Sequence, residues 1–560
     1  MVITHNFSGS RDAAPAAREI CHAALARKAA ASGIVLLKNN GILPLAATAP
    51  IALFGNGAGH TVKGGIGSGD VNNRENISIY EGLKAVGVPL TSESWIEDYE
   101  KRYMTARFQW RDKILEDAKK VENPFDAYAD NPFVLPQGRD IEPEDWRGAA
   151  AAVYVISRIS GEGKDRTAQE GDYRLSEQER EDLRRLDAAE LPVILLINAG
   201  GPVELTDLME QMHHLAAILQ ISQLGQQGGA AVADVLLGKV VPEGKLTATW
   251  ARRYTDYPSA DTFGACNGDL EKEIYTEGIY VGYRYFDSFD IQPLFPFGYG
   301  LSYTEFSVEF EGLEADAHAV RVAVKVSNTG KLYAGREVVQ VYAACPQNGG
   351  AKEYRRLVGF AKTQQLGPGE TQCVTIAVDA KQLAAFSQEK QAWILEQGVY
   401  TLFAGNSSVN CKPCAHLKVE TEKVLERTHP ICPVQHPFEE LKCAAPAMGK
   451  AALATQMKLP CVRFNHEPEE KAQAAIVPLA DGPVEELIPL LYGNITKGAS
   501  TLGSAGIRVP GSAGETSEAL ETSRGVRSLI MADGPAGLRL RQSYQVDRDT
   551  GEVIPTGVLG

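Results

Sequence analysis

The chain has 560 residues, which is too long for a single hydrophobic core and suggests about three or four domains. With 44% hydrophobic and 23% charged residues, the composition is that of a globular protein and excludes a disordered or fibrous one. The formal net charge of -15 argues against a nucleic acid or an anionic membrane as the main partner, and a neutral ligand fits better.

Membrane and secretion signals are not found in the sequence. No stretch approaches the roughly 20 apolar residues of a membrane span, and residues 1–18 lack the apolar core of a secretion signal. The 9 cysteines are an odd number and favour a reducing compartment over a disulfide framework. Cys411 and Cys414 form the one CxxC, and no further ligand pair completes a zinc set. We therefore expect a cytoplasmic protein with neither a metal nor another cofactor.

The first part of the chain alternates apolar strands with helices. An alanine-rich helix is expected over residues 12–31. Apolar runs predict strands at residues 50–55, 151–157, 192–198 and 216–222. Ser78 with Glu81, and Ser176 with Glu179, have the spacing of capping boxes that begin helices between these strands. Strand and helix in alternation predict a mostly parallel sheet with helices on both faces.

The pattern changes after residue 256. Residues 256–304 are rich in aromatic side chains and have no clear period, which is typical of a packed connector, although the rim of a ligand site remains an alternative. Valines then occupy every second position from 320 to 326, ahead of the turn at 328–330. This alternation and the short strands that follow predict a β-sandwich of immunoglobulin or fibronectin type III style.

Two predicted loops carry residues suited to contact a ligand. The glycine-rich residues 55–70 do not match the dinucleotide fingerprint, because position 60 is His, and they contain no phosphate-binding lysine motif. Glu162 stands between two glycines after the strand at 151–157, where ligands bind in sheets of this kind. A catalytic role and a solvated salt bridge with the neighbouring basic residues both remain open for it, and the second is commoner.

Several segments, taken in chain order, resemble β-glucosidases of glycoside hydrolase family 3. They are VLLKNNGILPL, IALFGNGAGHTVKGGIGSGDVNNR, SRISGEGKDR with EGDYRLSEQE, YTEGIYVGYRYFD, PLFPFGYGLSYTEF and ADGPAGLR. The likeness spans most of residues 20–410 and the last of these segments. It implies an α/β sandwich, a fibronectin type III-like domain and a (β/α)8 barrel, in a permuted order with the barrel last.

The resemblance and the composition together divide the chain into five parts. Residues 1–255 are expected to form the α/β sandwich and residues 256–304 the connector. The fibronectin type III-like domain is expected over residues 305–420 and a linker over residues 421–480. Residues 481–560 would then be the N-terminal part of a (β/α)8 barrel, which takes about 250 residues when complete, so the barrel is expected to be truncated.

The resemblance also assigns site residues. The acid/base of the family is a glutamate on a sandwich loop that reaches over the barrel mouth, and Glu162 matches it. Ser68 matches a sandwich position that touches the sugar. Asp533 follows the strand expected at residues 527–532, the first barrel strand, and matches an aspartate that holds hydroxyls of the terminal sugar. Arg539 is a second candidate for binding this sugar.

The retaining reaction needs a second carboxylate as nucleophile, about 5 to 5.5 Å from the acid/base. In the family this is an aspartate in a Ser-Asp-Trp type motif late in the barrel, and no such motif follows DGPAGLR. The resemblance therefore places the nucleophile beyond residue 560. We expect residues 1–560 alone to hydrolyse little or nothing.

The implied function is the removal of terminal non-reducing β-D-glucosyl residues from β-glucosides with retention. A non-catalytic carbohydrate-binding or scaffold fragment is the alternative of another class, and it would tolerate Glu162→Gln. Other specificities, such as β-xylosidase or β-N-acetylglucosaminidase, also stay open. The expected partners are a β-glucoside or oligosaccharide and either a second copy or a chain carrying the rest of the barrel, with no nucleic acid and no membrane.

Overall fold

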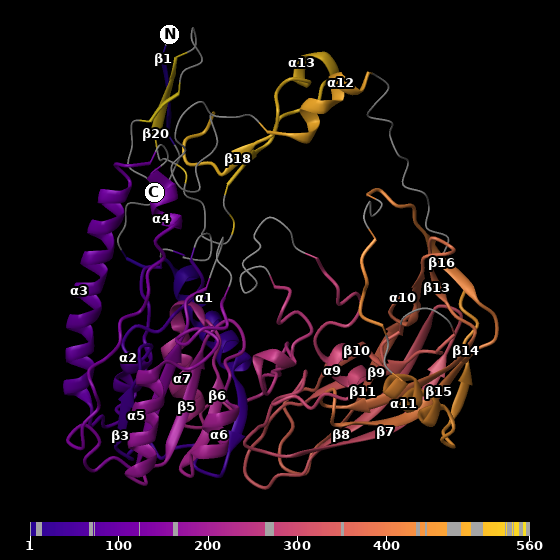
Figure 1. Cartoon of the computed structure of the whole chain (residues 1–560), viewed down its shortest axis with the longest axis horizontal. Coiled ribbons are helices and arrows are strands. Elements are labelled where there is room, and N and C mark those ends of the chain that lie inside the picture. The colour runs from indigo at the N-terminus through magenta and orange to yellow at the C-terminus, as the bar shows by residue number, and fades with distance from the viewer. Residues whose placement is uncertain are drawn as a thin grey trace.

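The computed structural model contains an α/β unit and a β-sandwich that lie side by side, with short C-terminal elements at one end (Figure 1). Both expected fold types are therefore present. The structure describes residues 2–6, 14–66, 71, 73–121, 124–160, 166–263, 274–348, 352–432, 437–442, 445–467, 483–493, 508–532, 534, 540, 543–547 and 553–555.

The α/β unit is centred on a five-stranded sheet in the order β2-β6-β5-β4-β3. Its strands are β2 (Val35–Asn39), β3 (Ile51–Phe54), β4 (Ala151–Ser157), β5 (Val193–Asn198) and β6 (Leu215–Gln220). Strands β3 to β6 are parallel, and β2 is antiparallel to β6. Every residue of β3, β4, β5 and β6 is buried, as expected for a sheet covered on both faces. The prediction of a mostly parallel sheet is confirmed.

Helices flank this sheet. They are α1 (Ala17–Gly33), α2 (Ile79–Ala85), α3 (Glu93–Asp117), α4 (Pro124–Ala129), α5 (Glu177–Ala188), α6 (Thr206–Gln211) and α7 (Gly228–Leu236). Helix α5 packs on β4 and β5, α3 packs on β3, and α1 and α2 each pack on α7. Both predicted capping boxes are formed, by Ser78 with Glu81 before α2 and by Ser176 with Glu179 before α5. The helix starts are therefore set by local sequence.

The connector packs aromatic side chains between the two units. It contains α9 (Tyr283–Phe289), a helix that the sequence did not indicate. Tyr280 and Phe286 are buried, and the Tyr280 hydroxyl donates to the Lys352 carbonyl over 3.1 Å. Trp250 and Phe295 meet edge to face, with ring centroids 5.9 Å apart. These contacts fit the interpretation of the segment as a packed connector.

The β-sandwich has sheets in the orders β10-β9-β14-β15-β17 and β11-β8-β7. Their strands are β7 (Phe306–Ala315), β8 (Ala319–Asn328), β9 (Val338–Ala344), β10 (Arg356–Lys362), β11 (Thr371–Asp379), β14 (Gly398–Gly405), β15 (Cys411–Val419) and β17 (Cys461–Arg463). The four alternating valines of β8 are fully buried between these sheets. A smaller sheet joins β12 (Ala385–Ser387), β13 (Ala392–Leu395) and β16 (Lys423–Arg427), beside the short helix α10 (Ala380–Leu383).

The segment expected to be a linker, residues 421–480, contains more structure than its composition indicates. It forms β16, the helix α11 (Ala445–Thr455) and β17. Strand β17 pairs in parallel with β15, and Phe464 is fully buried in the sandwich core. The His416 ring lies 2.9 Å from the Met457 carbonyl oxygen at the end of α11. These tertiary contacts, which composition does not reveal, order the described part of the segment.

The elements after residue 483 are short. They include α12 (Val484–Leu487), the 3-10 helix η4 (Ile488–Leu491), β18 (Gly514–Glu515), α13 (Glu521–Arg524) and β19 (Ile530–Met531). The strand expected over residues 527–532 is only two residues long and pairs antiparallel with β18. Among the described residues β18 and β19 form a two-stranded sheet, and an isolated pair of strands is only marginally stable. The assignment of residues 481–560 to a barrel stays a prediction.

A third small sheet joins distant parts of the chain. Strand β1 (Val2–Asn6) pairs antiparallel with β20 (Ser543–Asp547), which pairs with β21 (Val553–Pro555). The His5 and Tyr544 rings stack with their centroids 4.8 Å apart. Figure 1 shows β1 and β20 side by side above the α/β unit.

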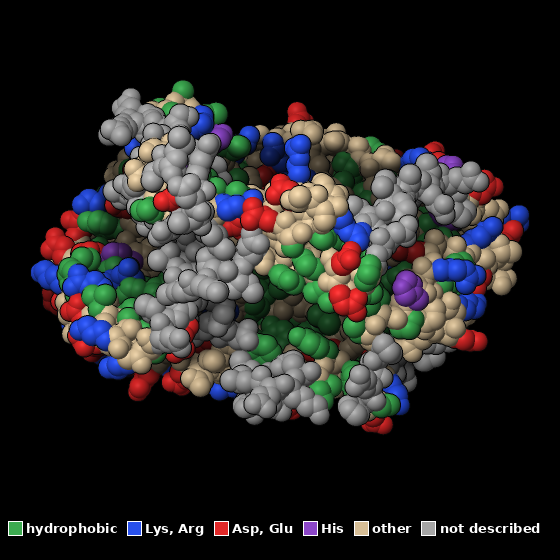
Figure 2. Space-filling model, turned by 90° about the horizontal axis from the view of Figure 1, so that it is seen from above, with side chains coloured by type: hydrophobic (Ala, Val, Ile, Leu, Met, Phe, Trp, Pro, Cys, Tyr) green, Lys and Arg blue, Asp and Glu red, His purple; other side chains and the backbone are tan. Residues whose placement is uncertain are grey.

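The described surface is mixed in charge. On the face shown in Figure 2, basic and acidic side chains are interspersed and do not gather into one basic patch. Among the described residues, no helix is both long and apolar enough to cross a membrane. Within the same residues, no cluster of side chains is suited to hold a metal ion.

Candidate active site

Two of the expected site loops start together at the carboxyl edge of the five-stranded sheet. The Ile66 N–H, on the loop after β3, donates to the Ser160 carbonyl on the loop after β4, over 3.1 Å. The segments that lead to the expected sugar-contacting serine and to the expected acid/base therefore leave the sheet side by side. The four site residues that the resemblance assigns lie outside the described residues. They are Ser68, Glu162, Asp533 and Arg539.

Asn198, the last residue of β5, ties the ends of neighbouring strands together. Its side-chain oxygen accepts from the Ser157 hydroxyl at the end of β4 and from the Val62 N–H, both over 2.7 Å. Its amide nitrogen donates to the carbonyls of Val62 (2.9 Å) and Ser222 (2.6 Å). Asn198 is fully buried, and these four bonds satisfy its polar atoms. The loops of the site therefore rest on a rigid polar base.

The glycines after β3 bring this loop against β4. Gly55 has φ of +94°, and a Cβ at Gly57 would lie 1.9 Å from the Ser157 hydroxyl oxygen. Asn56, between them, accepts from the Ser157 N–H over 2.8 Å. Only residues without a side chain allow this approach. At these two positions the glycine-rich segment serves close contact with a neighbouring strand.

Arg158, the first residue after β4, is buried in an ion pair. It is 5% exposed, and its two terminal nitrogens each lie 2.7 Å from a carboxylate oxygen of Glu179. The same Glu179 carboxylate accepts the Ser176 N–H over 2.8 Å at the start of α5. The salt bridge that the sequence left open was one between Glu162 and its basic neighbours, and it stays a prediction because Glu162 lies outside the described residues. Of those neighbours, Arg158 pairs with Glu179 and Arg166 pairs with Asp172.

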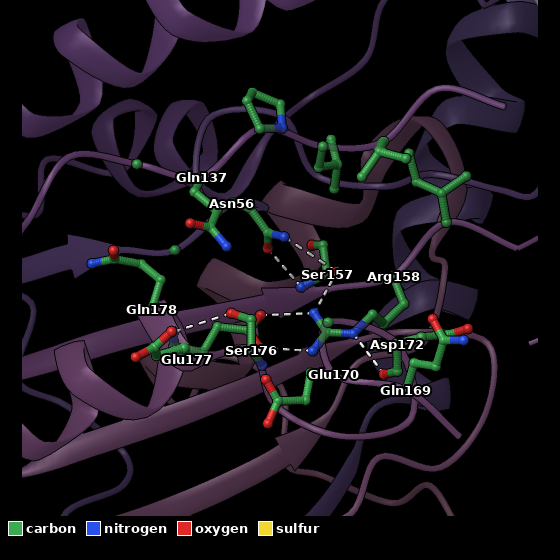
Figure 3. A pocket seen from close by; sticks show the side chains of 18 of the residues that line it. Asn56, Gln137, Ser157, Arg158, Gln169, Glu170, Asp172, Ser176, Glu177 and Gln178 are labelled. Carbon is green, nitrogen blue, oxygen red and sulfur yellow. Dashed lines mark hydrogen bonds and ion pairs between the residues drawn. The ribbon is translucent and has the colours of Figure 1, made fainter. Parts of the chain in front are cut away.

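Arg166, the first described residue after position 165, is held by Asp172. Its Nε donates to one carboxylate oxygen of Asp172 over 2.7 Å, and its Nη1 donates to the Pro202 carbonyl over 2.8 Å. The other Asp172 oxygen accepts the Thr167 N–H over 2.6 Å. Figure 3 shows Asp172 and Arg158 together on one side of the pocket. Arg158 and Arg166, which precede and follow the positions outside the described residues, are therefore each held by several polar contacts.

A cavity of about 620 Å³ lies beside these groups. Its lining includes the amide side chains of Gln137, Gln169 and Gln178, the apolar residues 132–136, and charged side chains such as Glu170 and Glu177 (Figure 3). Polar groups beside apolar side chains suit a ligand with hydroxyl groups and apolar faces. The neutral ligand expected from the net charge stays a prediction.

Asp182 of α5 also lines this cavity, and the sequence did not indicate it. It is 2% exposed, and burial raises its pKa to about 6 although the Tyr154 hydroxyl donates to it over 2.9 Å. Gln178 donates to its other oxygen over 2.9 Å. The sequence offered one signal for Asp182. It follows the capping-box residue Glu179 by one helical turn, which places both side chains on the face of α5 that is buried against the sheet.

Comparison with known protein families finds two domains. Residues 34–283 match the glycosyl hydrolase family 3 C-terminal domain, and residues 337–408 match the fibronectin type III-like domain. The two matches correspond to the α/β unit and the β-sandwich described above. Their order along the chain is that of the resemblance, with the α/β unit first.

Curated relatives and solved structures agree with these matches. A β-glucosidase of Ruminococcus albus is 32% identical over 539 residues, covering 91% of this chain and 54% of the relative. β-Glucosidase A of Butyrivibrio fibrisolvens is 36% identical over 431 residues, which cover 69% of this chain and 50% of that relative. A β-glucosidase structure from Paenibacillus barengoltzii has a TM-score of 0.70 at 28% identity and covers 94% of this chain and 59% of its own. The structure of β-glucosidase 3B from Thermotoga neapolitana in complex with glucose has a TM-score of 0.63 at 37% identity. The match covers 72% of this chain and 55% of that protein. The chain spans about half the length of the curated relatives it matches.

Proposed function

Residues 34–283 of this chain belong to glycosyl hydrolase family 3 as its C-terminal domain, and on that premise we propose that the protein removes terminal non-reducing β-D-glucosyl residues from β-glucosides. The observation that carries the proposal is the hydrogen bond from the Ile66 N–H to the Ser160 carbonyl, because it holds the first parts of the two expected site loops side by side. The relatives named β-glucosidase supply the substrate class. Glu162 is the proposed acid/base.

The proposed reaction has two steps with retention of configuration. In the first, protonated Glu162 gives its proton to the glycosidic oxygen while the bond from this oxygen to the anomeric carbon breaks. The leaving group departs as an alcohol, and a nucleophilic carboxylate bonds to the anomeric carbon. In the second, ionised Glu162 takes a proton from water, whose oxygen attacks that carbon and frees the nucleophile.

The sugar and the nucleophile are assigned to other parts of the protein. Asp533 and Ser68 are proposed to bind hydroxyls of the terminal glucose, with Arg539 as a further candidate. We place the nucleophilic aspartate outside residues 1–560, because no Ser-Asp-Trp type motif follows Asp533. A longer chain or another chain with the rest of a barrel would supply it. A cytoplasmic location stays a proposal that rests on the sequence.

The test of Glu162 compares substrates with poor and good leaving groups. For Glu162→Gln we expect kcat with an alkyl β-glucoside to fall by about 10² to 10⁴, because the leaving alcohol then lacks its proton donor. Turnover of 2,4-dinitrophenyl β-glucoside should fall far less, since its leaving group departs without a proton. Glu144→Gln, which changes a surface glutamate paired with Arg147, is the matched control and should leave both rates unchanged.

Intact mass decides where the nucleophile lies. Turnover by a protein of 60.5 kDa would show that these residues contain a nucleophile and would overturn its placement elsewhere. Turnover only by a heavier protein or complex would support that placement. Equal rates for the wild-type protein and Glu162→Gln with the alkyl glucoside would contradict the acid/base role and favour a carbohydrate-binding fragment.

A further inference from the structure

The small sheet β12-β13-β16 carries two exposed aromatic side chains, Phe386 and Trp393. We propose that these two residues form a second carbohydrate site, which binds a chain of β-linked glucosyl units. Figure 1 shows β13 and β16 on the side of the β-sandwich away from the α/β unit, so this site is separate from the candidate active site. The choice of a β-glucan as ligand rests on the proposed function, and the surface itself is argued from the described residues alone.

Strand β13 turns Trp393 outward. Its neighbours Ala392 and Ile394 are 0% and 5% exposed, whereas Trp393 is 43% exposed, because side chains alternate between the two faces of a strand. Phe386 lies directly opposite Trp393 on β12 and is also 43% exposed. The two ring centroids are 5.5 Å apart, and the ring planes meet at 61°. Rings at this angle form an open corner, in which one ring stacks on a sugar while the other contacts its edge.

Trp393 differs from the other tryptophans of the chain. All 5 tryptophans lie among the described residues, and the other four are buried or half-buried. The indole N–H groups of Trp95 and Trp110 donate to the carbonyls of Arg139 and Asn131, over 2.9 and 2.6 Å. Within the part of the chain that the structure describes, the Trp393 N–H donates to no other residue. Trp393 therefore keeps both its ring and its donor for a ligand.

The charged groups around the aromatic pair balance one another. Glu426 lies opposite Trp393 on β16, and Lys381 of α10 pairs with it at 2.8 Å. Lys390, in the turn between β12 and β13, pairs with Glu422. Each pair brings one positive and one negative group, so neither gives a net attraction for an anionic polymer. Ammonium and carboxylate groups both form hydrogen bonds with hydroxyls, which suits a neutral ligand rich in hydroxyl groups.

A β-linked glucosyl unit has the chemistry that this surface can bind. Its ring substituents are equatorial, so C–H groups cover both faces of the ring and hydroxyl groups surround its edge. A face of the sugar can pack on the indole of Trp393, and the edge hydroxyls can then reach the indole N–H and Glu426. Apolar contact with a few polar groups that fix orientation is the usual composition of a small-ligand site.

A protein interface is the first alternative explanation for the exposed pair. Aromatic side chains bury about 150 to 250 Å² each, so a pair that is 43% exposed offers roughly 200 Å² or less. A stable protein–protein interface takes about 800 Å² from each partner. The pair is therefore of the size that contacts a few sugar units and is too small for a stable dimer by itself.

A purely structural role is the second alternative. Aromatic side chains directly opposite each other on antiparallel strands stabilise the pairing of those strands. That role needs contact between the rings of Phe386 and Trp393 but gives no affinity for a sugar. It predicts that replacing Trp393 changes stability and leaves the binding of a glucan unchanged.

The first measurement is quenching of tryptophan fluorescence by acrylamide, which needs no turnover. Because Trp393 is the exposed tryptophan, it should supply most of the accessible emission. Saturating hydroxyethyl cellulose, a soluble β-linked glucan, should protect this emission from the quencher. Trp393→Phe should lose both the accessible emission and its protection. Unchanged quenching of the wild-type protein at saturating glucan would overturn the proposal.

The second measurement is retardation in native gels that contain the same glucan. Trp393→Ala should weaken the affinity about tenfold, because stacking on the indole is lost, and Trp393→Phe should weaken it less. Phe360→Ala is the matched control, since Phe360 of β10 is 68% exposed but has no second ring beside it among the described residues. It should be retarded as the wild-type protein is. If Trp393→Ala does not fold, Phe386→Ala decides by the same comparison.

The outcomes separate this inference from the proposed function. Equal retardation of Trp393→Ala and the wild-type protein would overturn the second site, and equal retardation by glycogen would overturn the choice of a β-linked glucan. A change of oligomeric state in Trp393→Ala with unchanged retardation would assign the pair to a second copy and overturn the sugar site. Failure of Glu162→Gln to affect the alkyl glucoside would overturn the proposed function, and reduced retardation of Trp393→Ala would still support the second site.

Discussion

Asn198 in the α/β unit and Asn328 in the β-sandwich make the same kinds of hydrogen bond but tie down different things. Each is buried at the end of a strand, accepts a hydroxyl and a backbone N–H, and donates to two carbonyls. Asn198 joins the loops of the candidate site, whereas Asn328 joins turns that connect β-sandwich strands. A buried, fully bonded asparagine therefore marks an ordered strand end, and its neighbours decide whether function follows.

Replacing both asparagines is the strongest test of this comparison. We expect Asn198→Ala and Asn328→Ala each to lower the free energy of unfolding by on the order of 4 kcal/mol, because several buried donors and acceptors lose their partners. Urea titration of each variant measures the loss. Hydrogen exchange should rise at residues 62–66 only for Asn198→Ala. A rise there in Asn328→Ala would show that the two strand ends are coupled and would undo the comparison.

Two aspartates should give opposite pH dependences in the two units. Burial raises the pKa of Asp182 to about 6, so the folded protein keeps a proton that the unfolded chain, with a pKa near 4, releases. The free energy of unfolding should therefore fall by roughly 3 kcal/mol as pH rises from about 4 to about 6. Urea titrations at pH values across this range, compared with Asp182→Asn, measure the contribution, which the variant should lack.

The β-sandwich supplies the control for this pH dependence. A hydrogen bond from Arg321 holds the pKa of Asp316 below its usual range. The stability that Asp316 contributes is therefore present above the unfolded pKa near 4 and is lost as pH falls further. Asp316→Asn should therefore weaken the pH dependence of the free energy of unfolding only below about pH 4. An unchanged slope between pH 4 and 6 in Asp182→Asn would contradict the assignment to Asp182.

Two glycines allow a similar comparison of the two units, with a smaller expected loss of stability. A Cβ at Gly57 would lie 1.9 Å from the Ser157 hydroxyl that Asn198 binds, and a Cβ at Gly330 would lie 2.0 Å from the Thr304 hydroxyl that Asn328 binds. We expect Gly57→Ala and Gly330→Ala each to cost about 2 kcal/mol in thermal unfolding, because these hydroxyls must move. Only Gly57→Ala should disturb the candidate site, which hydrogen exchange at residues 157–160 would detect. Equal exchange in both variants would argue against that link.

Surface ion pairs should show no difference between the units. Glu144 pairs with Arg147 at 2.9 Å in the α/β unit, and Glu309 pairs with Lys325 at 3.2 Å across β7 and β8. Both pairs are exposed, so Glu144→Gln and Glu309→Gln should each shift the melting temperature by less than about 1 °C. Calorimetry checks this. A larger shift in one variant would reveal a surface network beyond the simple pair.

Much of the fold could be predicted because its signals are local. The capping boxes at Ser78 and Ser176, the apolar runs of β3 to β6 and the alternating valines of β8 each lie within a few neighbouring residues. Structure that depends on distant partners was not visible. Strand β17 exists because it pairs with β15, about 45 residues earlier, and its own short sequence gives no period.

In the candidate site, too, local features could be predicted and contacts between distant residues could not. The sequence indicated the loop after β4 and offered Glu162 as a salt-bridge partner for the nearby basic residues, but it did not indicate that Arg158 pairs with Glu179. Glu179 could be recognised as a capping residue, yet its second role as the partner of Arg158 depends on α5 docking against β4. Asp172 lies in EGDYRLSEQE, one of the segments that carry the resemblance, but its contacts with Arg158 and Arg166 could not be predicted because they depend on the tertiary fold.

The pairing of β1 with β20 has a consequence for synthesis on the ribosome. Val2 faces Asp547 across this ladder, so the first strand to be made pairs with residues that are made more than 500 positions later. Loop closure costs about 0.6 kcal/mol more for each doubling of the loop length, so even this separation adds only a few kcal/mol relative to a short loop. The delay is in time: at about 5 to 20 residues per second, β1 waits at least roughly half a minute for its partner. During that interval the nascent chain carries an unpaired strand that chaperones or another chain can bind.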